Sequence, residues 1–367
     1  PDQPILAPLA SLRAFLRVGQ ALVFSEERIA SYAEARYEAF RQMGVPSELF
    51  DASIAYGDLV AEEVLTWASS DYYLETRSYP KFTVTGEPGV WQPTPPAYMD
   101  GVEPHWREIR PFVLDSAAQF SPPPPPPYSV EEGSPFMELV EEVYEVGNEL
   151  TYEQRAIASF WDCNPYVMHT RGHVMFATKK ITPGGHWIGI AGHASRATDA
   201  DFVSTARTYA LTAIALSDAF ISAWDEKYRS NLVRPETVIN EHIDPDWIPL
   251  LQTPPFPEHT SGHSVISAAA ATVLTNLYGP KFAFDDTTEV RYGLPVRSFA
   301  SFEAAAEEAA VSRLYGGIHY RPAIDDGFVQ GGQVGQLALQ ELIEPELAAS
   351  PESTVSPAFT VSQAVSE

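Results

Sequence analysis

Apolar residues recur three or four positions apart over long stretches of this sequence, and that spacing places them along one face of an α-helix. The stretches cover residues 10–43, 58–76, 136–146, 152–162, 201–228, 264–278, 301–313 and 327–342. Thr151 and Gln154 form a capping box where one of them begins. Strand signals are few. The sequence therefore predicts an all-α fold of helical bundles with little or no β-sheet.

Composition divides the 367 residues into three regions. Residues 1–130 combine helical stretches with a proline-rich segment, which ends in six consecutive prolines at positions 122–127. Such a run adopts the polyproline II conformation and predicts a rigid connector. Residues 131–345 hold the remaining helical stretches and are expected to form a helical bundle domain. Residues 346–367 contain proline and serine without periodicity, so we expect a loose tail.

Charge limits the partners of this chain. Its formal net charge is −26, from 49 acidic and 23 basic residues, which argues against nucleic acid and anionic membranes. No apolar run approaches the ~20 residues that a membrane span requires. A single cysteine, Cys163, excludes an intramolecular disulfide. The acidic charge and a first residue other than methionine lead us to expect a periplasmic or secreted protein, although trimming would give the same start.

Basic residues nevertheless gather at one place. Lys227, Arg229 and Arg234 fall within eight positions, and Pro235 disfavours a helix that continues past Val233. If the helix did persist, Lys227 and Arg234 would lie two turns apart on one face. Taken alone, the segment also fits a solvated basic helix end, which the helix dipole favours.

Two further segments carry histidine beside groups that bind anions. Ser261, Gly262 and His263 directly precede a helical stretch, so a hydroxyl, backbone N–H groups and an acid/base side chain would meet at its N-terminus. Arg313 offers a planar guanidinium to an oxyanion, and His319 follows six residues later. Alone, each segment also fits an ordinary helix end with a packed histidine. With the basic segment, they indicate an oxyanion site.

The order and spacing of the three segments carry a resemblance. Lys-x6-Arg-Pro at 227–235, Ser-Gly-His at 261–263 and Ser-Arg-x5-His at 312–319 resemble the signature that vanadium-dependent haloperoxidases share with type 2 phosphatidic acid phosphatases. The separations are similar too, with 24 residues between Pro235 and Thr260 and 48 residues between the second and third parts. The resemblance implies the helical-bundle fold of that superfamily.

The chain departs from the signature at two positions. Thr260 stands where proline usually precedes Ser-Gly-His. Ala323 stands where the phosphatases usually carry an aspartate that orients the nucleophilic histidine, and the nearest acids are Asp325 and Asp326. This displacement weakens the phosphatase interpretation more than the haloperoxidase one.

Two aromatic residues help to separate the subfamilies. Trp224 and Phe256 stand at positions that line the halide site of the haloperoxidases, and chloroperoxidases are similar in being aromatic at both. The Trp224-Asp225 pair and the glycine-rich segment 184–192 most resemble bacterial haloperoxidases of the iodoperoxidase type. The aromatic pair therefore does not by itself indicate chloride, and both side chains also fit a plain core.

The resemblance implies a vanadate cofactor and a role for each residue of the signature. His319 is implied to bind vanadium, and His263 to act as the acid/base catalyst. Contacts to the vanadate oxygens are implied for Lys227, Arg234, Ser261, Gly262 and Arg313, and Lys227 is also implied to polarise bound peroxide. Trp224 and Phe256 are implied to line the halide site. The implied reaction uses hydrogen peroxide to oxidise a halide to hypohalous acid, which halogenates small organic acceptors. Iodide is expected first and bromide next, with phosphate as a competing ligand.

Two other functions would use the same residues. A soluble acid phosphatase would form a phosphohistidine on His319, with His263 protonating the leaving group, and vanadate would inhibit it. A non-catalytic oxyanion-binding protein would need only the cations. The aromatic pair, the lack of a membrane span and Ala323 favour the haloperoxidase.

Overall fold

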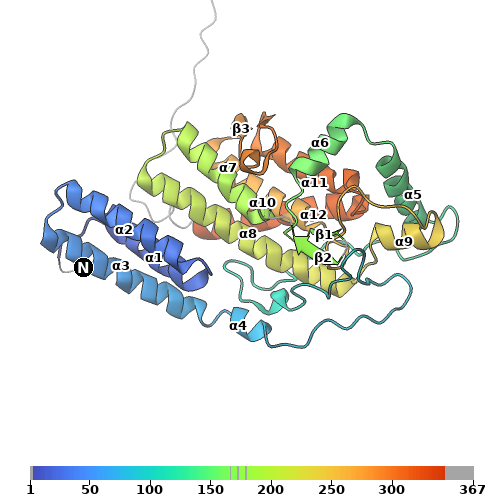
Figure 1. Ribbon diagram of the computed structural model, residues 1–367, viewed down its shortest axis with the longest axis horizontal. Helices are drawn as coiled ribbons and strands as arrows, with labels where there is room; N and C mark the ends of the chain where they lie inside the picture. Colours follow the sequence, from blue (N-terminus) through green and yellow to red (C-terminus); the bar gives the residue numbers. More distant parts are fainter. Residues whose placement is uncertain (1–2, 166, 172, 178–179, 344–367) are drawn as a thin grey trace, which may run out of the picture. The chain divides into compact units, whose positions relative to one another are not determined.

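The computed structural model describes residues 3–165, 167–171, 173–177 and 180–343. The chain divides into two compact units, one of residues 1–80 and 108–110 and the other of residues 81–107 and 111–367 (Figure 1). The region 1–130 is thus divided between the units. The tail expected at residues 346–367 lies outside the described residues.

The first unit contains α1 (Ala7–Leu22), α2 (Glu26–Gln42), α3 (Ser47–Ala68) and α4 (Tyr73–Thr76). The continuous helix predicted over 10–43 is wrong, because the chain is extended at Val23 and Ser25 is the N-cap of a new helix. Glu26 and Glu27 in the first turn favour that start through the helix dipole. Apolar side chains form the core of this unit: Leu9, Leu16, Ala33, Tyr37 and Phe50.

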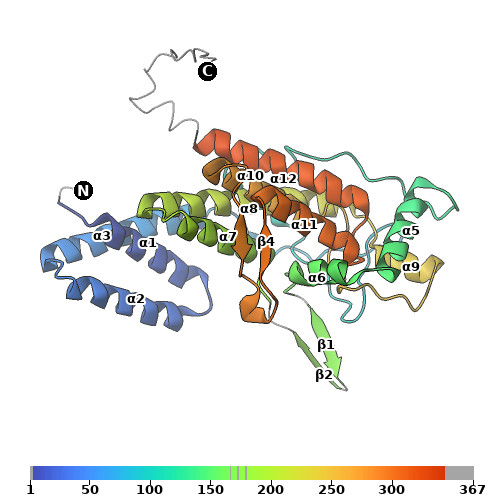
Figure 2. The ribbon, with the colours of Figure 1, turned by 90° about the horizontal axis from the view of Figure 1, so that it is seen from above.

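The second unit contains α5 (Pro135–Asn148), α6 (Tyr152–Phe160), α7 (Pro183–Ala197), α8 (Phe202–Ser230), α9 (Pro235–His242), α10 (Gly262–Tyr278), α11 (Phe302–Tyr315) and α12 (Arg321–Leu342). The centre of this unit is α10, with α8, α11 and α12 packed alongside it (Figure 2). Apart from Thr272, residues 264–274 of α10 are buried, as expected for a helix that is apolar or small all round. The predicted all-α fold is confirmed. Within the described residues, no helix is long and apolar enough to span a membrane.

Glycines on α12 allow it to pack closely against α10. Gly327, Gly331 and Gly335 recur every fourth residue and contact α10. A Cβ atom at Gly331 would lie 1.9 Å from the carbonyl oxygen of Val265, so a larger residue would force the helices apart. The packing brings together the N-terminal ends of both helices, which adjoin the second and third parts of the signature.

Short antiparallel hairpins account for the strands among the described residues: β1 (Met168–Arg171) with β2 (Val174–Ala177), and β3 (Phe284–Asp286) with β4 (Arg297–Phe299). Phe284 lies opposite Phe299 in the second hairpin, and both side chains are buried against the helical core. The 3-10 turn η2 (Val290–Tyr292) lies in the connection between β3 and β4, and the 3-10 turn η1 (Trp106–Glu108) lies earlier in the chain, between α4 and α5. This small β content agrees with the sequence-based expectation.

The first part of the signature crosses a helix boundary. α8 ends at Ser230 because Asn231 adopts a left-handed conformation with φ 48°. Arg234 is the N-cap of α9, and Pro235 occupies its first turn. Lys227 and Arg234 therefore lie on different elements rather than on one helix face.

Candidate active site

The three parts of the signature meet around one cavity of about 300 Å³. The predicted site residues in its wall are Gly262, His263, Arg313, His319, Trp224 and Phe256. Lys227 and Arg234 lie beside this wall, and the charged group of each is 5.1 Å from the centroid of the Phe256 ring. The fold thus brings the predicted residues together from segments up to about 90 positions apart, while their roles stay predictions.

Three buried cations give the site its charge. Lys227 and Arg234 are 0% exposed and Arg313 is 1% exposed. Burial lowers the pKa of Arg234 to about 10, and it also lowers the pKa of Lys227 and of Arg313. The Nη2 atoms of both arginines are buried and have no hydrogen-bond partner within the part of the chain that the structure describes. Unpaired donors and excess positive charge fit an oxyanion, which would supply both acceptors and counter-charge.

Lys227 differs from the two arginines because its donors are already used. Its ammonium donates to the carbonyl oxygens of Pro257 at 3.2 Å, of Glu258 at 3.1 Å and of Thr260. An ammonium has three hydrogens, so these bonds satisfy it. Lys227 therefore holds the loop before α10 in place and acts on the cavity through its charge. A direct contact with an oxyanion would require one of these bonds to open.

His319 is held in one tautomer by a buried carboxylate. Its Nδ1 lies 2.8 Å from Oε1 of Glu258, which also accepts the backbone N–H of Tyr320 at 2.9 Å. Because a carboxylate only accepts hydrogen bonds, Nδ1 carries the hydrogen and Nε2 keeps its lone pair. Burial and Arg234 lower the pKa of His319 well below its ordinary value, so the ring is neutral. Nε2 faces the cations and accepts a hydrogen bond from Nη1 of Arg234 at 3.2 Å, so a metal at this lone pair would replace that bond.

Glu258 is the site residue that sequence reasoning missed. The expected orienting acid follows His319, where Ala323 stands, but the structure supplies a carboxylate from a loop 61 residues earlier. Asp326 lies 3.9 Å from His259 instead. Burial raises the pKa of Glu258 to about 7. The sequence does offer one signal, because Glu258 is an acidic residue in a segment that otherwise carries no aspartate, glutamate, lysine or arginine. Only the fold shows that its partner is His319.

The N-terminus of α10 adds backbone donors. Ser261 is the N-cap, and its Oγ accepts the N–H of Ser264 at 3.3 Å. The N–H of Ser261 donates to the carbonyl oxygen of Ala323 at 2.8 Å, which ties this end to α12. The N–H groups of Gly262 and His263 have no acceptor within the helix, as at every helix start. Such groups, aided by the helix dipole, bind anions.

His263 is an uncharged base in the cavity wall. Burial and the neighbouring Arg313 lower its pKa well below the ordinary value. Its Nε2 lies 3.5 Å from Nη1 of that arginine, at the outer limit of a hydrogen bond. A neutral imidazole can accept a proton at neutral pH. The positive charge of Arg313 beside the ring then favours release of that proton from His263.

Aromatic rings form another part of the cavity wall. The Trp224 ring is 4.9 Å from the Phe256 ring and 4.8 Å from the Trp106 ring, which in turn is 5.6 Å from Phe220. The indole N–H of Trp224 donates to the carbonyl oxygen of Val102 at 3.1 Å, so its polar atom is turned away from any ligand. The cavity therefore presents apolar faces beside a strongly cationic wall.

Buried histidines make this fold sensitive to acid. Burial lowers the pKa of His259 to about 4. Between pH 6.5 and 4 the His259 ring is therefore protonated in the unfolded chain but neutral in the folded chain. Stability is therefore expected to fall as pH falls through this range, by up to roughly 3 kcal/mol from His259 alone. His259→Gln should reduce the slope of unfolding free energy against pH, measured by urea unfolding. A slope for His259→Gln equal to that of the wild type would contradict this assignment.

Comparison with known proteins identifies the family. The family described as the VCPO second helical-bundle domain matches residues 207–345, which include the whole signature. A crystal structure described as the first bacterial vanadium-dependent iodoperoxidase is similar with a TM-score of 0.87 and 54% identity, covering 93% of this chain and 81% of that chain. This chain belongs to the vanadium-dependent haloperoxidases.

Other relatives of this haloperoxidase are more distant. A holo-type bacterial vanadium-dependent chloroperoxidase shares the fold, with a TM-score of 0.65 and 16% identity over 91% of this chain and 81% of that chain. The vanadium chloroperoxidase of Curvularia inaequalis is 32% identical over 99 residues. That match spans 23% of this chain and 16% of the relative.

Proposed function

We propose that this haloperoxidase binds vanadate between its buried cations and uses hydrogen peroxide to oxidise halide, iodide foremost, to hypohalous acid. The observation that carries the proposal is that the buried Nη2 atoms of Arg234 and Arg313 have no hydrogen-bond partner among the described residues and lie beside Nε2 of His319, which accepts from Nη1 of Arg234. These groups fit a multiply charged oxyanion with a metal at its centre.

Each residue of the site has one task in this proposal. His319 would hold vanadium through Nε2, and Glu258 holds the ring in the tautomer that this requires. Arg234, Arg313 and the backbone N–H of Gly262 would donate hydrogen bonds to the vanadate oxygens. Bound vanadate supplies a Lewis acid that makes hydrogen peroxide reactive toward halide.

Proton transfer falls to His263. Its neutral ring would accept the proton that hydrogen peroxide loses on binding and would give that proton to the oxygen that departs as water. The buried charge of Lys227 draws electron density away from the oxygens near it without donating a hydrogen, because its three hydrogens are bonded to backbone carbonyls. The ring faces of Trp224 and Phe256 limit the water that reaches the halide.

Two considerations support iodide as the favoured halide. Iodide is the most easily oxidised of the three heavier halides, and the iodoperoxidase structure is 54% identical to this chain. Small organic acceptors would then be halogenated by the hypohalous acid. Steady-state kcat/KM for iodide, bromide and chloride under one set of conditions tests this preference, and a higher value for bromide would overturn it.

Phosphatase activity is a second candidate, because one observation favours it. A histidine that attacks phosphate needs an acid on its other ring nitrogen, and Glu258 provides one where Ala323 cannot. We therefore propose that the vanadate-free protein hydrolyses phosphate monoesters slowly through His319. The aromatic wall of the cavity favours halide oxidation as the main activity.

One pair of assays on the full chain tests both activities. Protein stripped of bound oxyanions is assayed before and after addition of orthovanadate, once for peroxide-dependent triiodide formation and once for p-nitrophenyl phosphate hydrolysis. We expect iodide oxidation only with vanadate, and suppression of hydrolysis by it. Loss of both activities in His319→Ala excludes a contaminant. Hydrolysis without halide oxidation at any pH would make the protein a phosphatase.

Vanadate should also stabilise the fold. The cations repel one another without an anion, so a ligand that binds only the folded state raises the melting temperature. At about 100 times its Kd the ligand contributes about 2.7 kcal/mol, which for a unit of this size corresponds to a rise of roughly 5–10 °C. Differential scanning fluorimetry measures it, with phosphate expected to act in the same direction and chloride at equal ionic strength as control. An unchanged melting temperature at saturating vanadate would contradict the proposed site.

A further inference from the structure

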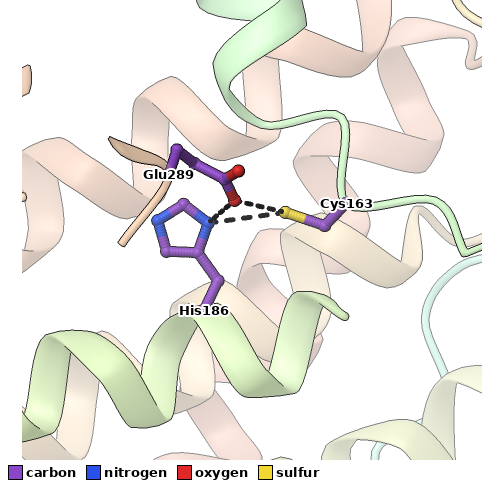
Figure 3. Close-up of side chains that lie close together, drawn as sticks. All are labelled: Cys163, His186 and Glu289. Atoms are coloured by element: carbon purple, nitrogen blue, oxygen red, sulfur yellow. Dashed lines mark hydrogen bonds and ion pairs between the residues drawn. The ribbon is translucent and has the colours of Figure 1, made fainter. Parts of the chain in front are cut away.

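Three buried side chains of different chemistry meet beside the oxyanion site. Cys163 follows α6, His186 lies on α7, and Glu289 directly precedes η2 (Figure 3). Cys163 and His186 are 0% exposed and Glu289 is 4% exposed. Cys163 also lines the 300 Å³ cavity, so the cluster is reached from there. The proposed halide oxidation uses none of the three.

The three potential ligand atoms face one another at distances that suit a small metal ion (Figure 3). Nδ1 of His186 lies 3.2 Å from Oε1 of Glu289 and 3.4 Å from Sγ of Cys163, and that sulfur is 3.9 Å from the same oxygen. Zinc bonds of ~2.0–2.3 Å in a tetrahedron separate such atoms by about 3.3–3.6 Å. The observed triangle therefore needs only small shifts to become three corners of a zinc site.

The other ring nitrogen of His186 is held as in many metal sites. Nε2 lies 2.7 Å from Oδ2 of Asp286, and the second oxygen of Asp286 accepts from the backbone N–H and the hydroxyl of Thr288 at 2.9 and 2.6 Å. The Trp161 ring stacks on the imidazole at 4.6 Å and 19°. A carboxylate on the far nitrogen fixes the ring so that Nδ1 faces Cys163 and Glu289, the position from which it would bind a metal in place of its present contacts.

We propose that Cys163, His186 and Glu289 bind a zinc ion through Sγ, Nδ1 and Oε1, with Asp286 orienting the ring. Thiolate, imidazole and carboxylate together favour Zn²⁺ over Mg²⁺ or Ca²⁺, which prefer oxygen ligands alone. Binding releases two protons to solvent, that of the Cys163 thiol and that on Nδ1 of the His186 imidazolium, and forms the sulfur–zinc and nitrogen–zinc bonds with no change of oxidation state. Three protein ligands leave a fourth position for water or another small ligand.

The single cysteine of the chain makes the site directly observable. The chain of 367 residues, without an affinity tag, is freed of metal with a chelator and given one equivalent of Co²⁺. Thiolate-bound Co²⁺ has a sulfur-to-metal charge-transfer band in the near ultraviolet, and this band can come only from Cys163. We expect the band at a stoichiometry of one, its loss on titration with Zn²⁺, and one zinc per chain by elemental analysis.

Variants then test the individual ligands. Cys163→Ser should abolish the charge-transfer band and the bound zinc, and Asp286→Asn should lower zinc affinity by ~10–100-fold. His193→Gln is the matched control, because His193 also lies on α7 but contacts Arg196 and Thr287 instead. Wild-type protein without the band, or Cys163→Ser that still binds one zinc tightly, would overturn the proposal. The wild-type spectrum decides the matter even if a variant fails to fold.

Discussion

Replacing His263 by alanine is expected to lower kcat for peroxide-dependent iodide oxidation by ~10²–10⁴-fold, the range usual for loss of a positioned acid/base. The reason is geometric, since His263 is the neutral base in the cavity wall next to Arg313. The cations and His319 remain, so the Kd of vanadate should stay within about threefold of the wild-type value. Steady-state triiodide formation and a vanadate titration measure the two quantities.

His259→Gln provides the matched control for this variant. His259 lies four residues earlier and is also buried, but its Nε2 is 3.9 Å from Asp326. We expect its kcat at neutral pH to remain close to wild type. If His263→Ala kept full turnover, another group would be the base. If it lost vanadate binding instead, His263 would be a vanadate ligand rather than a proton carrier.

Replacing Glu258 by glutamine is expected to weaken vanadate binding by ~10–100-fold, as for other partners that orient a metal-bound histidine. The amide keeps the shape and can still accept the hydrogen on Nδ1 of His319, but it lacks the charge that makes Nε2 a better ligand. Because the pKa of Glu258 is raised to about 7, the carboxyl is neutral at lower pH and resembles the amide there. The difference in Kd should therefore be largest above pH 7 and shrink as pH falls below it.

Glu236→Gln separates this effect from the general loss of a buried carboxylate. Glu236 is buried near Arg234, but its carboxylate accepts from the hydroxyl of Thr253 rather than from His319. We expect its vanadate Kd to remain near the wild-type value at all pH values. Equal Kd values for Glu258→Gln and wild type above pH 7 would remove Glu258 from the site. A pH-independent difference would indicate a structural role instead.

Much of the fold could be predicted because its signals are local. Helical periodicity identifies α5, α8, α10 and α11 to within a few residues, and the capping box at Thr151 occurs as predicted. The break at Val23 was missed because neither proline nor glycine marks it. α12 begins at Arg321 rather than at 327 because Pro322 suits a first helical turn, which sequence periodicity does not register.

The sequence by itself determined the family and the chemical types at the site, because the three parts of the signature are short and their spacing is specific. The tertiary structure alone decided how these groups are connected. It paired Glu258 with His319 across 61 positions and directed the donors of Lys227 to backbone carbonyls. It also placed Cys163 beside His186 and Glu289. Such contacts depend on how helices pack, and packing joins residues whose separation along the chain carries no periodic signal.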